Sequence, residues 1–151
     1  MTQTLVNQIL ELQSLSLFSQ STAEDLSEVA ALVSARRAEK GTVLFREGEP
    51  GDAMYLIRSG EVTLSRSGKI IDHVGASEAC GIVSVLDQLP REMTATVTMD
   101  ASLLVIRGDD LMQLLADRPL LMHSVFRALT SALRSQLDRV SLGKRPEDWS
   151  W

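Results

Sequence analysis

The sequence predicts a mainly β domain with flanking helices, and three observations lead to this fold class. Apolar residues follow helical spacing before residue 34 and again after residue 107. Between these segments, short β-rich runs are separated by glycine or charged residues at intervals of about 8–12 residues, which is typical of an antiparallel sandwich or barrel. The length of 151 residues fits one domain. We expect that domain to span residues 1–141, with helices at 1–33, β-structure at 34–107, helices at 108–141 and a flexible tail at 142–151.

Two helices are expected before the β-structure. The first is predicted by apolar residues at near-helical spacing, namely Leu5, Ile9, Leu10 and Leu12. The second is predicted by a capping box, because Ser21 is followed three residues later by Glu24. This helix is expected to cover roughly Thr22 to Val33.

Six short runs in the middle of the chain are predicted to be strands. Two of them alternate polar and apolar residues, as strands with one solvated face do, and the last is mostly apolar and short enough to be a buried strand. The six runs are Thr42 to Phe45, Met54 to Arg58, Glu61 to Ser65, Ile70 to Val74, Thr94 to Met99, and Ala101 to Ile106.

Two further helices are expected after the β-structure. The first covers residues 108–115, and Pro119 separates it from a longer helix over about 120–140. Apolar residues of the longer helix recur every three or four positions in one stripe, at Met122, Val125, Phe126, Leu129, Leu133, Leu137 and Val140. The stripe is expected to pack on the domain's own β-structure or, in its outer turns, against a second protomer.

Charge and composition exclude several classes of partner. The chain carries 15 basic and 20 acidic residues and a net charge of −5, which disfavours a broad footprint on nucleic acid. No apolar run approaches the roughly 20 residues of a membrane helix, so no membrane insertion is expected. Residues 1–13 lack the pattern of a signal peptide, and the single Cys80 fits a reducing compartment, so we expect a cytoplasmic protein.

The chain offers few groups for catalysis. A metal enzyme built on a small β-barrel needs several converging ligands, whereas His73 and His123, the two histidines, fall in a predicted strand and on the long helix. Neither Cys80 nor any serine has a recognisable base nearby in sequence. We therefore expect no enzyme and no bound metal, with a cupin-like metal enzyme as the alternative from that class.

The stretch from Ala79 to Arg91 suits a phosphate. Gly81 allows a close backbone turn, and the apolar residues after it can form one helical turn with free N–H groups. Arg91 can supply a charge-assisted hydrogen-bond fork. The alternative is an exposed Pro90-Arg91 turn in which Arg91 pairs with the neighbouring Glu92.

Further segments show that the chain resembles the cyclic nucleotide-binding domain family over roughly Leu15 to Leu137. The matching segments are Leu15-Ser16-Leu17-Phe18, Asp25-Leu26, Lys40 to Asp52, Met54 to Val62, Val83 to Asp87, Pro90-Arg91 and Thr94-Ala95-Thr96-Val97. The resemblance implies an N-terminal helical piece and an eight-stranded antiparallel β-roll of the jelly-roll type, a double-stranded β-helix. It also implies a phosphate-binding cassette and a C-terminal two-helix lid.

The resemblance implies the ligand-binding residues as well. In the family, a cassette glutamate accepts hydrogen bonds from a ribose hydroxyl, and an arginine neutralises the cyclic phosphate. The matching residues are Gly81 for the cassette glycine, Ile82 at the position of the glutamate, Val83 and Ser84 for the small residues, and Arg91 for the arginine. Alignment from the Thr94-Ala95-Thr96-Val97 side instead places Met93, next to Thr94, in the phosphate slot.

The resemblance implies a non-enzymatic regulatory domain that binds cAMP or cGMP and needs no cofactor. It is expected to signal through its C-terminal helices to a protein partner or a second protomer. Because Ile82 cannot accept a hydrogen bond, the alternative is a degenerate member that serves as a protein-interaction or dimerisation module. The 11 residues after Val140 are too few for a helix-turn-helix domain, so a stand-alone module without direct nucleic-acid binding is expected.

Overall fold

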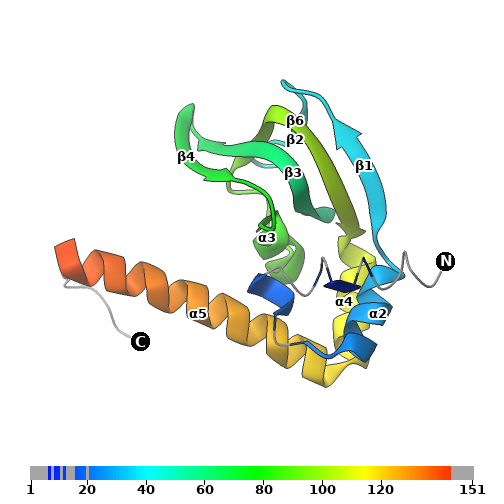
Figure 1. Ribbon diagram of the computed structural model, residues 1–151. Helices are drawn as coiled ribbons and strands as arrows, with labels where there is room; N and C mark the ends of the chain where they lie inside the picture. The colour runs from blue at the N-terminus through cyan, green and yellow to red at the C-terminus, as the bar shows by residue number, and fades with distance from the viewer. Residues whose placement is uncertain (1–6, 8, 11, 13–15, 20, 144–151) are drawn as a thin grey trace.

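The computed structural model describes residues 7, 9, 10, 12, 16–19 and 21–143, and these form a curved antiparallel sheet with helices below it (Figure 1). The predicted fold class is confirmed. The elements in chain order are η1 (Ser16–Phe18), α2 (Ala23–Ala30), β1 (Ser34–Ala38), β2 (Val43–Phe45), β3 (Ala53–Arg66), β4 (Lys69–Val74), β5 (Ala79–Cys80), α3 (Ile82–Asp87), β6 (Thr94–Arg107), α4 (Gly108–Asp117) and α5 (Pro119–Gly143).

The sheet is built around the two longest strands, β3 and β6. Its order is β1-β6-β3-β4, with β2 also paired to β6 and β5 to β3, and every pairing is antiparallel. The described residues form six strands rather than the expected eight, because β3 and β6 are 14 residues long and each joins two predicted runs. β2 pairs with the first part of β6 and β1 with the last part, so both lie along the edge of β6 opposite β3. We call this curved sheet the roll.

Gly60 marks the bend that divides β3 into its two predicted parts. Its φ is +93°, and a Cβ at this position would collide with the backbone oxygen of Asp100. The register between β3 and β6 shifts on both sides of the bend. A glycine in mid-strand therefore bends the strand here without ending it.

The N-terminal helices differ in detail from the prediction. Residues 7, 9, 10 and 12 are helical, whereas Leu5 lies outside the described residues. The N-cap of α2 is Thr22, whose hydroxyl accepts a hydrogen bond from Asp25 N at 3.1 Å, so the predicted capping residue Ser21 is wrong by one position. The helix ends at Ala30, before the predicted end at Val33.

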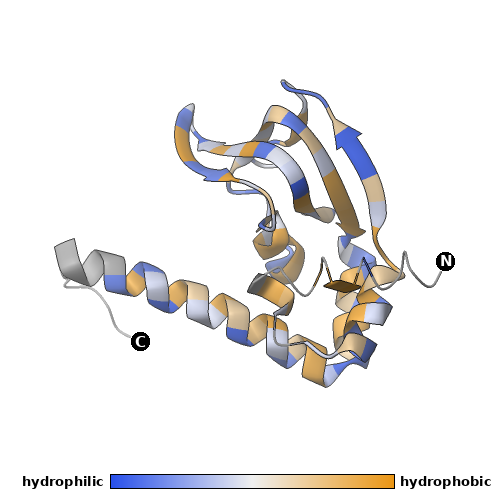
Figure 2. Cartoon of the chain, in the orientation of Figure 1, coloured by the Kyte–Doolittle hydropathy of each residue, from blue (hydrophilic) through white to orange (hydrophobic). Residues whose placement is uncertain are grey.

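Two apolar clusters form the core. One lies inside the roll and includes Phe45, Tyr55 and Val62. The other lies between the sheet and the helices and includes Leu104 and Leu121. Orange apolar stretches occur in α2, in α4 and at the start of α5 (Figure 2). Since α3 contributes Val85 to this second cluster, α3 is packed on the same core as the C-terminal helices.

The C-terminal helices lie where predicted. α5 begins at Pro119, because proline fits the first turn of a helix, and runs away from the sheet past α3 (Figure 1). It extends to Gly143, so residues 142 and 143, which were predicted to be tail, are helical, and 144–151 lie outside the described residues.

The apolar residues of α5 occupy two faces, so the predicted single stripe is wrong. Leu121 and Val125 are buried in the core, whereas Met122, Phe126 and Leu133 are 45%, 67% and 44% exposed. The α5 side chains at residues 139–143 lie outside those that the structure describes, and with them the predicted stripe residue Val140.

Candidate binding site

The turn between β5 and α3 has the conformation that the sequence predicted. Gly81 has a φ of +86°, in the left-handed region that glycine adopts most readily, and α3 begins at the next residue. A Cβ on Gly81 would lie 2.8 Å from Nη1 of Arg91. Gly81 therefore allows both the turn and the close approach of the arginine.

Arg91 is buried below this turn, with 3% of its surface exposed. Nη1 donates a hydrogen bond to Gly81 O at 2.7 Å and Nη2 donates one to Ala53 O. The guanidinium carbon lies 4.0 Å from the centroid of the Phe45 ring. Stacking on an aromatic face and two carbonyl acceptors hold the cation in one orientation.

The backbone of Arg91 is also fixed. Arg91 N donates to Glu49 O at 2.8 Å, and Gly48 N donates to Arg91 O at 2.9 Å. The loop between β2 and β3 thus pairs with the segment that carries the arginine. The alternative of an exposed Pro90-Arg91 turn is wrong for Arg91, because its side chain enters the protein.

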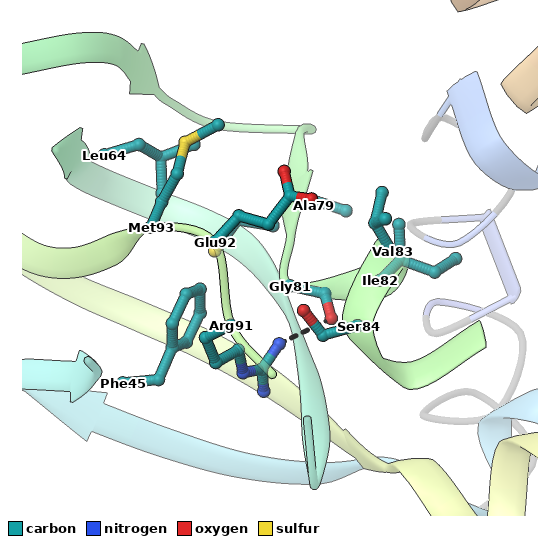
Figure 3. A pocket seen from close by; sticks show the side chains of 11 residues that line it. Phe45, Leu64, Ala79, Gly81, Ile82, Val83, Ser84, Arg91, Glu92 and Met93 are labelled. Atoms are coloured by element: carbon teal, nitrogen blue, oxygen red, sulfur yellow. Dashed lines mark hydrogen bonds between the residues drawn. The ribbon is translucent and has the colours of Figure 1, made fainter. Parts of the chain in front are cut away.

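A cavity of about 240 Å³ lies beside Arg91 and the first turn of α3 (Figure 3). Most of its wall is apolar, with Phe45, Leu64 and Met93 among the larger side chains. Its lining residues are Phe45, Leu64, Ala79, Cys80, Gly81, Ile82, Val83, Ser84, Arg91, Glu92 and Met93. None of these comes from α4 or α5, so the two C-terminal helices do not cover this pocket in the structure.

The positive charge of Arg91 is only partly compensated. Its ion-pair partner among the described residues is Asp52, at 3.6 Å, rather than the neighbouring Glu92. The Asp52 side chain is 83% exposed, so water screens much of this attraction. The Nε atom of Arg91 is buried without a hydrogen-bond partner. An anion in the adjacent cavity would supply the missing counter-charge.

The pocket lining contains two side chains that could act as nucleophiles, Cys80 and Ser84. Cys80 is poorly suited to nucleophilic attack. Burial raises the pKa of the Cys80 thiol to about 12, although Arg91 acts in the opposite direction. The thiol therefore stays protonated near neutral pH, and the thiolate is the nucleophilic form. The Cys80 thiol is therefore a poor nucleophile at neutral pH.

Most of the residues expected in the site meet at the pocket. Gly81, Ile82, Val83, Ser84, Arg91 and Met93 all line it. Thr94 is not among the lining residues, and its hydroxyl accepts a hydrogen bond from Glu47 N at 3.1 Å. Arg91 lies next to Gly81, whereas Met93 lies next to Leu64 on another part of the wall (Figure 3). Both candidates for the phosphate slot therefore border the cavity.

Sequence reasoning missed Phe45, Leu64 and Glu92 as pocket residues. Phe45 and Leu64 belong to strands β2 and β3, far from the cassette in the sequence. The only signal for Phe45 was its place at the end of an apolar run, which any core residue shares.

Two other kinds of site receive no support from the described part of the chain. It contains no group of three or more His, Cys, Asp and Glu side chains that could hold a metal ion. His73 Nδ1 lies 3.0 Å from the hydroxyl oxygen of Thr63, within hydrogen-bond distance. Among the helices of the same residues, none is long and apolar enough to cross a membrane.

Similar proteins are found among regulators and channels. A Rhodopseudomonas palustris protein named as a potassium channel is 37% identical over 107 residues, which is 68% of this chain and 26% of that protein. A CRP-like cAMP-activated global transcriptional regulator of Mycobacterium tuberculosis is 33% identical over 100 residues, or 63% of this chain and 45% of the regulator. The chain thus spans between a quarter and a half of the length of these relatives.

A solved structure agrees with these similarities. The N-terminal domain of a transcriptional regulator from Streptomyces coelicolor superposes with a TM-score of 0.72 at 32% identity, covering 85% of this chain and 95% of that domain. The model of the family described as "Cyclic nucleotide-binding domain" matches residues 35–118, a segment that includes the roll, the cassette turn and Arg91. By this match over more than half of its length, the chain belongs to the cyclic nucleotide-binding domain family.

Proposed function

We propose that this chain is a non-enzymatic regulatory domain whose pocket beside α3 binds a cyclic nucleotide, cAMP or cGMP. The observation that carries the proposal is Arg91, a buried cation next to an open cavity. One of its nitrogen atoms has no partner among the described residues, and its ion-pair partner is exposed to water. A phosphate in the cavity would pair with this charge through charge-assisted hydrogen bonds.

The shape and polarity of the pocket also suit a nucleotide. Its volume of about 240 Å³ is close to the lower end of the range of about 300–1,000 Å³ for small-molecule sites. The walls formed by Phe45, Leu64 and Met93 are apolar and can pack against the faces of a base. The Mycobacterium tuberculosis relative is named for activation by cAMP, which makes this nucleotide the first ligand to test.

The proposed signal passes through the C-terminal helices. Ile82 lines the pocket and also packs against the apolar cluster that contains Leu111 of α4 and Leu121 of α5. A ligand that moved the first turn of α3 would therefore also move Ile82, which packs against the apolar cluster shared by α4 and α5. α5 would transmit the change to a protein partner or to a second protomer.

A second candidate function is an interaction or dimerisation module that binds no cyclic nucleotide. It is favoured by Ile82, an apolar side chain where the family resemblance places a hydrogen-bond acceptor. It is also favoured by the exposed apolar side chains of α5, Met122, Phe126 and Leu133.

Calorimetric titration with cAMP and cGMP, together with thermal unfolding, distinguishes the two functions. Linear AMP serves as the control ligand, because it carries the same base and sugar without the cyclic phosphate. We expect saturable heat and a rise in Tm with at least one cyclic nucleotide, since a ligand of the native state must stabilise it. Absence of both effects at millimolar cAMP and cGMP would contradict cyclic nucleotide binding.

A further inference from the structure

We infer that Glu92 is the residue that recognises a hydroxyl group of the ligand, and that it thereby selects a ribonucleotide over a deoxyribonucleotide. The inference rests on the proposed function, because it concerns the same pocket. It assigns a specificity role to a residue that would otherwise repel a phosphate.

The first observation is where Glu92 lies. Its side chain lines the pocket and reaches toward Ala79, while Arg91 lies on the other side of Gly81 (Figure 3). No ion pair or hydrogen bond between described residues involves its carboxylate, and Arg91 pairs with Asp52 instead. The carboxylate is thus available to a ligand.

The second observation is that the backbone on both sides of Glu92 is held in place. Arg91 is bonded through its N–H and its carbonyl to the loop at Gly48 and Glu49. Thr94 accepts a hydrogen bond from Glu47 N at the start of β6. Only Glu92 and Met93 lie between these anchors, and both line the pocket. The anchors on both sides therefore fix the short backbone segment from which these two side chains extend, next to Arg91.

The third observation is the composition of the wall. Its charged and polar side chains, apart from the thiol of Cys80, are Arg91, Glu92 and Ser84. An ionised carboxylate can only accept hydrogen bonds, so its complement on the ligand is a donor. The pocket consequently fits a molecule that carries an anion for Arg91 and a hydroxyl for Glu92.

A cyclic nucleotide carries such a pair of groups. Its phosphate is esterified to two ribose oxygens, which leaves the 2′-hydroxyl as the one free hydroxyl of the sugar. A ligand without that hydroxyl would leave the Glu92 carboxylate facing the phosphate with no donor between them. Loss of a hydrogen bond to a charged acceptor corresponds to roughly a tenfold or greater loss of affinity.

The test compares cAMP with 2′-deoxy-cAMP by calorimetry on the parent chain and on Glu92→Ala, Glu92→Gln and Glu39→Ala. Glu39 is an exposed glutamate outside the pocket lining, so Glu39→Ala controls for the change in net charge. We expect the parent and Glu39→Ala to bind cAMP about tenfold more tightly than the deoxy analogue. Glu92→Ala should bind cAMP about tenfold more weakly and no longer distinguish the two ligands. Glu92→Gln, which keeps an acceptor oxygen, should retain part of the preference.

Three results would overturn the inference. Equal binding of cAMP and 2′-deoxy-cAMP by the parent would overturn the role of Glu92 and leave the proposed function intact. Tighter binding of cAMP by Glu92→Ala would show that the carboxylate only repels phosphate. Failure of the parent to bind any cyclic nucleotide would overturn both proposals. Thermal unfolding of each variant checks that the fold is retained, which is expected because Glu92 is exposed.

Discussion

Arg91 connects three segments that are far apart in the sequence. Its guanidinium bonds to the carbonyls of Gly81 and Ala53 and stacks on the ring of Phe45. Replacement by alanine would leave two carbonyls without donors in a buried site. We therefore expect Arg91→Ala to lower the free energy of unfolding by about 1–3 kcal/mol and to abolish cyclic nucleotide binding. Urea unfolding followed by circular dichroism, and calorimetry with cAMP, measure the two effects.

Arg37→Ala is the matched control, because Arg37 is an exposed arginine on β1. It should change the free energy of unfolding by no more than about 0.5 kcal/mol. Arg91→Lys should fall between the two, since it keeps the charge and loses the planar fork. If Arg91→Ala unfolds at the same urea concentration as the control, the side chain does not hold the cassette turn.

Individual residues were predictable from the sequence only where one residue type decides the outcome. Gly81 was identified because few other residues fit a left-handed turn, and its φ of +86° confirms this. The burial of Arg91 was not predictable, because its acceptors at Gly81 and Ala53 and its aromatic neighbour at Phe45 meet only in the fold. The sequence suggested Glu92 only as an ion-pair partner of Arg91, since the direction of its side chain depends on backbone bonds to distant loops.

At the scale of the elements, strands with a buried face were found and strands without one were missed. β1 has the sequence Ser-Ala-Arg-Arg-Ala, and four of its five residues are exposed, so it has no apolar pattern to detect. β5 is two residues long. Long strands were divided at Gly60 and near Asp100, because a bend and a chain break look alike in a local pattern.

The junction between α4 and α5 is tied to α2 by a cluster of charges. Arg118 lies between the two helices, and its guanidinium lies 3.5, 3.5 and 3.1 Å from carboxylate oxygens of Glu24, Asp25 and Glu28. The Asp25 side chain is only 9% exposed, so this pair is screened less than the other two. These ion pairs thus connect α2 to the position at which α5 begins.

Arg118→Ala should therefore lower the free energy of unfolding, by about 1 kcal/mol at low ionic strength because most of the partners are partly exposed. The loss should shrink in high salt, which screens the pairs in the parent. Arg134→Ala, on α5, is the control, since Arg134 is exposed and takes no part in this cluster. Denaturant unfolding at two salt concentrations measures the difference. An equal loss at both concentrations would assign the effect to packing rather than to charge.

For the molecule as a whole, α5 is the element that reaches furthest from the roll (Figure 1). Its inner face, with Leu121 and Val125, is buried in the core shared with α3 and α4. Met122, Phe126 and Leu133 form a second face, since at 3.6 residues per turn they fall within about 40° of one another. The two faces are adjacent on the helix, so the apolar spacing in the sequence does not separate them. Only the fold shows which of the two faces remains exposed.

The exposed face of α5 predicts self-association of the full chain. Burial of Phe126 and Leu133 against a second copy would remove the remaining exposed surface of two large apolar side chains, which are 67% and 44% exposed, from water. Complete burial of such a side chain contributes about 1.5–3 kcal/mol, so each contributes a part of this. We expect sedimentation velocity to show a dimer at tens of micromolar protein, and a monomer for the double variant Phe126→Ser, Leu133→Ser. Leu120→Ser is the matched control, because Leu120 is 74% exposed and lies on a different side of the helix. A monomeric parent, or equal disruption by Leu120→Ser, would contradict this face as the contact between protomers. If cAMP also shifts the dimerisation constant, the pocket and α5 are coupled, since a ligand can change an equilibrium only by its different affinity for the two states.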